Sequence, residues 1–82
     1  MTVHESSTLE DSIKEIAAEV FLLSREEISE DMSPEDIDAW DSFGQLNLVS
    51  SIEERYSITF EVEEIFQIVS IKSIIDLVSK KI

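Results

Sequence analysis

The 82-residue sequence contains no cysteine, one histidine, one glycine and one proline. The absence of cysteine excludes a disulfide framework, a thiolate metal site and a thiol nucleophile. The single histidine, His4, stands near the N-terminus, where chains commonly fray, so we expect neither a metal site nor a serine–histidine relay to depend on it. One glycine and one proline are too few turn residues for an all-β fold. We therefore expect a helical protein with no catalytic residue and no bound metal, and not an enzyme.

Basic residues are also few, because 6 Lys and Arg stand against 19 Asp and Glu, giving a net charge of −13. Binding to nucleic-acid phosphates or to anionic membranes needs the opposite sign, so we expect neither. No apolar run approaches the ~20 residues that span a bilayer. The N-terminus also has neither the basic start nor the apolar stretch of a signal peptide. We expect a cytoplasmic monomer without membrane insertion, whose partners are basic proteins.

Apolar residues recur at three- and four-residue steps, the spacing of one helix face, in three segments. The first segment predicts a helix over about residues 8–22, where Thr8 and Asp11 resemble a capping box. Its apolar stripe, which we expect to be buried, comprises Leu9, Ile13, Ile16, Ala17, Val20 and Phe21.

Two further stripes predict helices in the second half of the chain. One helix follows Asp41, whose carboxylate suits an N-cap. The last helix begins after Ser70 as N-cap and ends at Lys80 and Lys81, whose charge complements a helix C-terminus. The residues expected in the core are Phe43, Leu46, Val49, Ile52 and Tyr56, with Leu48 on the flank, and Ile71, Ile74, Ile75, Val78 and Ile82.

Between these two helices, residues 61–67 predict a short helix, after an extended connector over residues 58–60. Val62, Ile65 and Phe66 are expected to face inward from the short helix. The predicted fold class is all-α: a small four-helix bundle of three main helices and a short third helix.

Residues 23–40 form a long connection, since about 2–8 residues is usual between helices of a small domain. Four apolar residues are spaced along it, and we expect them to hold an ordered loop between the first and second helices. They are Ile28, Met32, Ile37 and Trp40. The loop is acidic, with Glu26, Glu27, Glu30, Asp31, Glu35, Asp36 and Asp38, and Asp41 just beyond it. A long ordered loop is more often functional than decorative.

Ser42 stands where this loop meets the second predicted helix. The free N–H groups and the positive dipole end of a helix N-terminus favour an attached or bound anion. The position therefore suits a phosphodiester on Ser42. No base stands near it in the sequence, so another protein must modify this serine.

The residues around Ser42 resemble the acyl carrier protein family, also called phosphopantetheine-binding or thiolation domains. The matching residues are Asp41-Ser42-Phe43, then Leu46, Leu48, Val49, Ile52, Glu53 and Glu54, and upstream Ile28, Met32 and Ile37. The Asp-Ser pair alone is weak evidence, because Asp11-Ser12 repeats it inside the first predicted helix. Its place at the loop–helix junction, with the flanking helices in register, makes the signal specific. The resemblance covers about residues 8–80 of a single domain spanning 1–82.

The resemblance implies that Ser42 bears 4′-phosphopantetheine, which a phosphopantetheinyl transferase takes from coenzyme A. The cofactor would supply the thiol that the sequence lacks, and acyl or aminoacyl cargo would be carried as a thioester. The flexible arm would present this cargo to partner enzymes at high effective concentration. The implied partners are an acyl-activating ligase, a ketosynthase or an acyltransferase with a basic docking surface.

The second predicted helix departs from the acid-rich helix that housekeeping fatty-acid carriers share. Its first half is uncharged, with Gly44, Gln45, Asn47, Ser50 and Ser51. This departure disfavours a fatty-acid synthase role and favours a specialised pathway, such as polyketide, non-ribosomal peptide, lipid or surface-glycan acylation. The run from Asp41 to Gly44 also looks like that of D-alanyl carrier proteins, a reading that stays open.

Residues beside Ser42 also have ordinary structural readings. Asp41 fits a plain cap as well as transferase recognition, and Phe43 fits a core anchor as well as a partner contact. Trp40 is expected to hold the loop. Gly44 costs roughly 1 kcal/mol in a helix relative to Ala, and it either leaves room for the arm or a partner or is a neutral choice.

Two other function classes suit an acidic helical chain. An EF-hand calcium loop needs Gly at its sixth position, but loops starting at Asp31 or Asp36 place Asp there. A non-catalytic acidic adaptor for a basic protein partner stays open, and it predicts no covalent change at Ser42.

Overall fold

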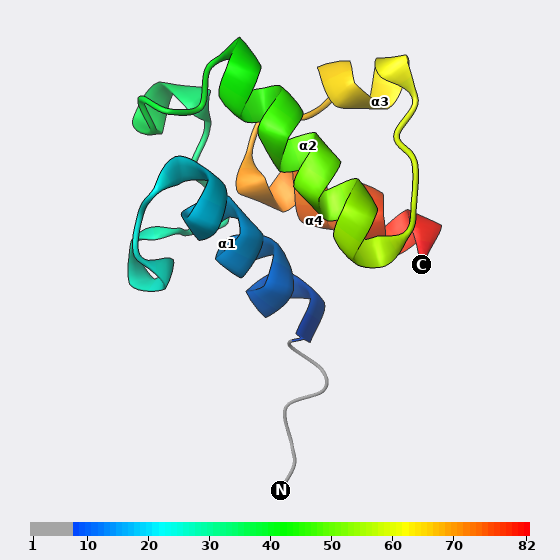
Figure 1. Cartoon of the computed structure of the whole chain (residues 1–82), viewed down its shortest axis with the longest axis horizontal. Coiled ribbons are helices and arrows are strands. Elements are labelled where there is room, and N and C mark those ends of the chain that lie inside the picture. The colour runs from blue at the N-terminus through cyan, green and yellow to red at the C-terminus, as the bar shows by residue number, and fades with distance from the viewer. Residues whose placement is uncertain (1–7) are drawn as a thin grey trace, which may run out of the picture.

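The computed structural model describes residues 8–82, which form four α-helices and two single-turn 3₁₀ helices without any strand (Figure 1). The all-α prediction is confirmed. The elements are α1 (Thr8–Phe21), η2 (Arg25–Glu27), η3 (Pro34–Asp36), α2 (Ser42–Tyr56), α3 (Val62–Phe66) and α4 (Ile71–Lys81). None of the helices within this range has the length and apolar character needed to cross a bilayer.

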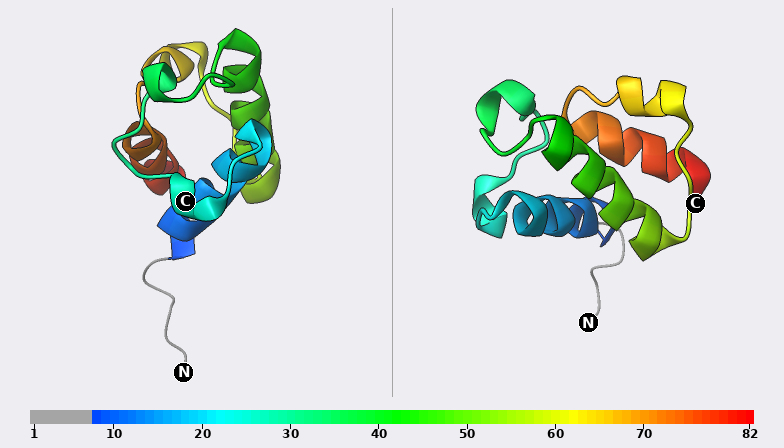
Figure 2. Two further views of the ribbon diagram at one scale, coloured as in Figure 1. Left: turned by 90° about the vertical axis from the view of Figure 1, so that its left-hand side faces the viewer. Right: turned by 45° about the horizontal axis from the view of Figure 1, so that its top comes forward.

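The three long helices share one apolar core, because α1 packs against both α2 and α4 (Figures 1 and 2). The largest side chains that are almost wholly buried are Ile13, Leu48, Ile52, Ile71, Ile74 and Val78. The core stripes of the first and last helices are thus confirmed, with one exception. Ile82 is 64% exposed, because it follows the last residue of α4 and helical periodicity no longer directs its side chain.

The buried face of α2 differs in part from the prediction. Val49 and Ile52 are buried as predicted and Tyr56 is partly buried, but Phe43 and Leu46, also expected in the core, are 78% and 55% exposed. Gly44 and Leu48 face inward together with Ile52, at four-residue steps. The reason lies at Gly44, where a Cβ atom would overlap the carbonyl oxygen of Ala39. A helix face that meets the loop backbone this closely turns the bulky neighbouring side chains toward solvent.

The inward orientation predicted for α3 is also wrong for two residues. Val62 and Phe66 are 67% and 80% exposed, and only Ile65 is partly buried against the core. A five-residue helix makes less than two turns, so it has one short strip that can face the core.

The long connection between α1 and α2 is ordered, as predicted (Figure 2). Ile28, Ile37 and Trp40 are at most 4% exposed, and Met32 packs partly buried against the core. The Trp40 ring stacks on Phe21 of α1 with centroids 5.3 Å apart. Side chains of this irregular segment therefore form part of the hydrophobic core.

The loop is also joined to the start of α4 by backbone hydrogen bonds. The N–H of Ile71 donates to the carbonyl of Met32 at 3.0 Å, and the N–H of Lys72 donates to that of Glu30 at 2.8 Å. These bonds satisfy first-turn donors of α4 that have no partner within the helix. The loop thus caps α4 as well as leading into α2.

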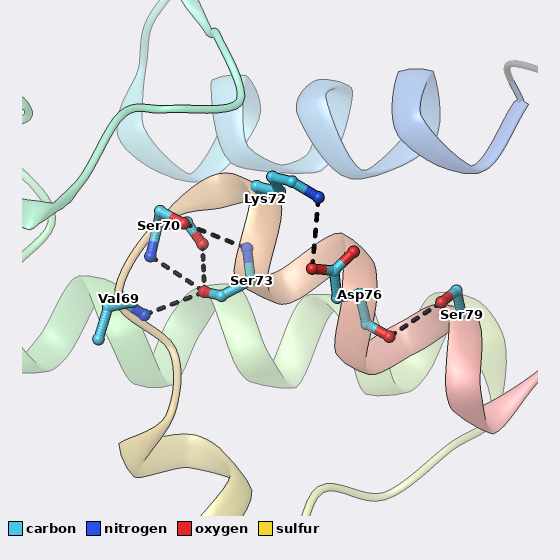
Figure 3. A network of polar contacts seen from close by, with 6 residues as sticks. All are labelled: Val69, Ser70, Lys72, Ser73, Asp76 and Ser79. Atoms are coloured by element: carbon cyan, nitrogen blue, oxygen red, sulfur yellow. Dashed lines mark hydrogen bonds and ion pairs between the residues drawn. The ribbon is translucent and has the colours of Figure 1, made fainter.

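Serine side chains fix the turn from α3 into α4 (Figure 3). The Ser70 hydroxyl accepts from the N–H of Ser73 at 3.2 Å, which confirms Ser70 as the N-cap. The Ser73 hydroxyl in return accepts from the N–H groups of Val69 and Ser70, both at 3.0 Å. This reciprocal arrangement is a capping box with serine in place of glutamate, and it satisfies backbone N–H groups at the turn into α4.

Candidate functional site

Asp41 sets the start of α2 and thereby the position of Ser42. Its backbone is extended, and its carboxylate accepts a hydrogen bond from the N–H of Gly44 at 2.9 Å. The carbonyl of Asp41 accepts from the N–H of Gln45 at 2.8 Å, the first bond of the helix. The predicted N-cap is confirmed. Ser42 is consequently the first helical residue, and its side chain is exposed.

Two open grooves meet at Ser42. Three residues, Ser42, Gln45 and Ile68, line both of them. The first groove, of about 310 Å³, lies toward the loop and is completed by Pro34, Trp40 and Asp41. The second, of about 350 Å³, lies toward α3 and is completed by Leu46, Ile65 and Phe66. A group attached to Ser42 therefore has a wall of mixed polar and apolar residues on the loop side and a mostly apolar wall on the α3 side.

Gln45 lines both grooves and joins three parts of the chain. Its side-chain oxygen accepts a hydrogen bond of 2.6 Å from the indole Nε1 of Trp40. Its amide nitrogen donates to the carbonyl of Ile65 at 3.2 Å, linking α2 to α3. In the sequence, Gln45 stood out only as an uncharged residue, although its place three residues after Ser42 on one helix face was a usable signal.

Exposed apolar side chains surround the serine. Phe43 follows Ser42 directly, and Leu46 and Phe66 line the groove toward α3. Large apolar groups at such high exposure, gathered at one place, are typical of a surface that contacts another protein. Because Phe43 is exposed, it is not a core anchor, and a contact with a partner protein is the interpretation that remains.

Charge is divided sharply around the site. Residues 22–41 hold eight acidic residues and one basic residue, a net charge of −7 out of −13 for the chain. Residues 42–52 carry no charge. The serine thus stands at a boundary between a strongly negative loop and a neutral helix face.

A separate ion pair holds α3, whose Ile65 carbonyl forms part of the site. The Glu64 carboxylate accepts from the N–H of Glu61 at 2.7 Å and pairs with the Lys81 ammonium at 2.9 Å. The backbone N–H of Glu61, and after it the charge of Lys81, lower the pKa of Glu64 below its ordinary value of 4.5. The end of α4 thereby anchors α3 beside α2.

Residues 8–82, which include the site, contain neither histidine nor cysteine. His4 lies outside the residues that the structure describes. Within residues 8–82, no three acidic or histidine side chains converge closely enough to hold a metal ion. What the site does offer is an exposed hydroxyl at a helix start, where free N–H groups and the positive dipole end stabilise a phosphate. The geometry fits a phosphate-linked arm attached to Ser42, with room for the arm in either groove.

Comparison with known proteins identifies related sequences and structures. A family model described as the phosphopantetheine attachment site matches residues 11–78. Among solved structures, the chain is similar to the holo acyl carrier protein from Geobacter metallireducens, determined by solution NMR, with 36% identity and a TM-score of 0.80. The match covers 92% of this chain and 85% of that one. A comparison with curated protein sequences gave no match.

Proposed function

Because this chain belongs to the phosphopantetheine attachment-site family and is an acyl carrier protein, we propose that Ser42 is the residue that bears its 4′-phosphopantetheine. The observation that carries this assignment is the exposed Ser42 hydroxyl on the first residue of α2, at the meeting point of two open grooves. The chance pair at Ser12 has no such setting, because Ser12 lies within α1.

The residues of this chain would hold and orient the arm. When bound, the cofactor supplies the thiol on which acyl groups are carried. The Asp41 cap fixes the first turn of α2, so that Ser42 is exposed and a phosphate on it would lie at the positive end of the helix dipole. No histidine stands within residues 8–82 to take the proton from Ser42. Activation of the serine is therefore the task of a separate phosphopantetheinyl transferase.

The surface around Ser42 supports a carrier of a specialised pathway. Exposed Phe43 and Leu46, on a helix face without charge, suit apolar contacts with an acyl-activating ligase, a ketosynthase or an acyltransferase. The negative loop beside them suits long-range attraction of a basic rim around such a contact. The D-alanyl carrier alternative rests on the run from Asp41 to Gly44. That support is reduced by the packing role of Gly44 against Ala39, which is independent of cargo.

The experiment that tests the assignment is intact mass spectrometry before and after incubation with coenzyme A and a broad-specificity transferase. We expect the mass of one phosphopantetheine to be added to the wild type and to Ser12→Ala, the matched control. We expect no addition to Ser42→Ala, with an unchanged circular dichroism spectrum. If the folded wild type gains no mass beside another carrier that does, the assignment fails. The chain would then be better explained as an adaptor for basic partners.

A further inference from the structure

Gln45 lines both grooves at Ser42. Its side chain is held at both ends, by the indole N–H of Trp40 at 2.6 Å and by the carbonyl of Ile65 at 3.2 Å. Ile68, which is buried, lines both grooves together with Gln45. The groove toward α3 is open from Ser42, but a chain that goes deeper between α2 and α3, toward the core, must displace this amide.

Displacement would leave polar groups without partners. Trp40 is 3% exposed, and its indole N–H is a donor only, so it would need a new acceptor at a site with little exposed surface. The Ile65 carbonyl would keep its second bond, from the N–H of Ile68 at 3.1 Å. The freed Gln45 amide would need new partners as well. An unmade hydrogen bond at a buried site costs more than the bond contributes when it is made.

We propose that Gln45 is a latch that keeps the tail of a small acyl group in the open groove and out of the core between α2 and α3. The carrier thereby holds short or polar cargo at its surface. The inference rests on the proposed attachment at Ser42. The limit on tail length follows because an apolar tail must recover the loss of two hydrogen bonds from its own burial. That requires roughly four methylene groups, so shorter tails gain nothing by entering.

The grooves themselves are consistent with cargo at the surface. Leu46 and Phe66 provide an open apolar wall on which a few carbons can rest without disturbing Gln45. On the other side, Asp41 and the Gln45 amide line the groove toward the loop and offer hydrogen-bonding groups to a polar substituent. Both surfaces are reached from Ser42 without opening the helices.

The latch can be tested first on the chain before any loading. Trp40 is the one tryptophan of the sequence, so its indole N–H gives a single assigned signal in a ¹H–¹⁵N spectrum. We expect hydrogen exchange of this proton to be at least about tenfold faster in Gln45→Ala than in the wild type or in Gln67→Ala. Gln67 is an exposed glutamine and provides the matched control. Equal exchange rates in all three proteins would overturn the latch, whatever happens at Ser42.

The second part compares acetyl and butyryl forms, loaded from the acyl coenzyme A compounds by the transferase and checked by intact mass. We expect the Tm of the wild type and of Gln67→Ala to be the same for both acyl groups. In Gln45→Ala, the butyryl group is expected to raise the Tm by at least about 5 °C, because the tail can enter. Gln45→Met, which also lacks the hydrogen bonds, replaces Gln45→Ala if the latter does not fold.

The outcomes separate the two proposals. A wild-type Tm that already rises with butyryl would show that the tail enters past Gln45 and would overturn the latch. A Tm that rises in none of the variants would overturn it as well, since removing Gln45 would then open nothing. Absence of any mass gain would instead overturn the attachment at Ser42 and with it the placement of the cargo, while indole exchange would still decide whether the hydrogen bond between Gln45 and Trp40 exists.

Discussion

The loop of residues 22–41 and the first half of α2, residues 42–52, behave in opposite ways. The loop lacks long regular structure, yet Ile28, Ile37 and Trp40 in it are at most 4% exposed. The helix is regular, yet it presents Phe43 and Leu46 to solvent. In these two segments, whether an apolar side chain is buried depends on its contacts with the core. It does not depend on whether the residue belongs to a helix.

The two segments also divide the work at the surface. The loop, which ends at Ser42, holds a net charge of −7, whereas residues 42–52 are neutral and partly apolar. Charge acts over several ångströms and guides an approaching partner, while apolar groups act only in contact. Stability and attraction come from the irregular segment, and the contact surface comes from the regular one.

The largest effect should come from truncating the two aromatic residues on either side of Ser42, of which Trp40 is buried and Phe43 is exposed. Trp40→Ala removes a buried ring that stacks on Phe21, and we expect a loss of about 3–5 kcal/mol in the free energy of unfolding. Phe43→Ala removes an exposed ring and should change the same quantity by less than about 0.5 kcal/mol. Urea denaturation followed by circular dichroism measures both, since Trp40→Ala removes the fluorescent residue. Equal losses would refute the contrast.

The contact between the two segments is tested by Gly44→Ala. In an exposed helix this change stabilises by roughly 1 kcal/mol. Here the added methyl would overlap the Ala39 carbonyl oxygen and lie 3.1 Å from Phe21, so we expect a net loss of about 1–3 kcal/mol. Asn47→Ala, at an exposed position on the same helix, is the control and should stay near neutral. A stabilised Gly44→Ala protein would contradict this prediction, because it would mean that the loop backbone at Ala39 moves away without loss of stability.

A smaller effect of opposite sign is expected where the loop begins. Leu22 has a positive φ of 60° and is 88% exposed, and the following N–H, of Leu23, bonds back to the carbonyl of Ala18 at 2.9 Å. Glycine adopts this left-handed conformation without the steric cost of a side chain. Leu22→Gly should therefore stabilise the fold by about 1 kcal/mol in thermal or urea unfolding. Ser57→Gly, with a φ of 56° at the end of α2, repeats the test, and destabilisation in both would contradict it.

The smallest effect lies outside both segments, at Glu64. Its pKa is lower in the folded chain than in the unfolded chain, so its stabilising contribution is complete above about pH 4.5 and is lost as the pH falls through the folded pKa. Glu64→Gln lacks that contribution at every pH. The difference in Tm between wild type and variant should be constant near neutral pH and should shrink toward pH 3. A difference that grows on acidification would show the opposite sign of the pKa shift.

Much of the fold could be predicted from local signals. The caps Asp41 and Ser70 mark the starts of α2 and α4, and the first helix ends within one residue of its predicted boundary. The apolar spacing of the loop correctly identified its buried residues. In each case the signal and the structure that it predicts lie within a few residues of each other.

What could not be predicted depends on contacts between distant residues. The orientation of α2 follows from the approach of the Ala39 carbonyl to Gly44, and periodicity alone favoured the face with Phe43 and Leu46. The Gln45 bridge joins a residue to a carbonyl twenty positions later. Spacing places Gln45 on the same helix face as Ser42, but it predicts neither the bridge nor the Gly44–Ala39 contact, because both exist only once the loop, α2 and α3 have packed together.

The backbone bonds from α4 to the loop, at Met32 and Glu30, bear on how the protein resists proteases. A surface loop is usually cut during local opening that leaves the rest of a domain folded. Here the loop shares the core and caps α4, so exposing its peptide bonds requires most of the domain to unfold. Cleavage there should be as rare as global unfolding. The folded chain is thus a rigid support, and the motion that brings the cargo to one enzyme after another is that of the phosphopantetheine arm.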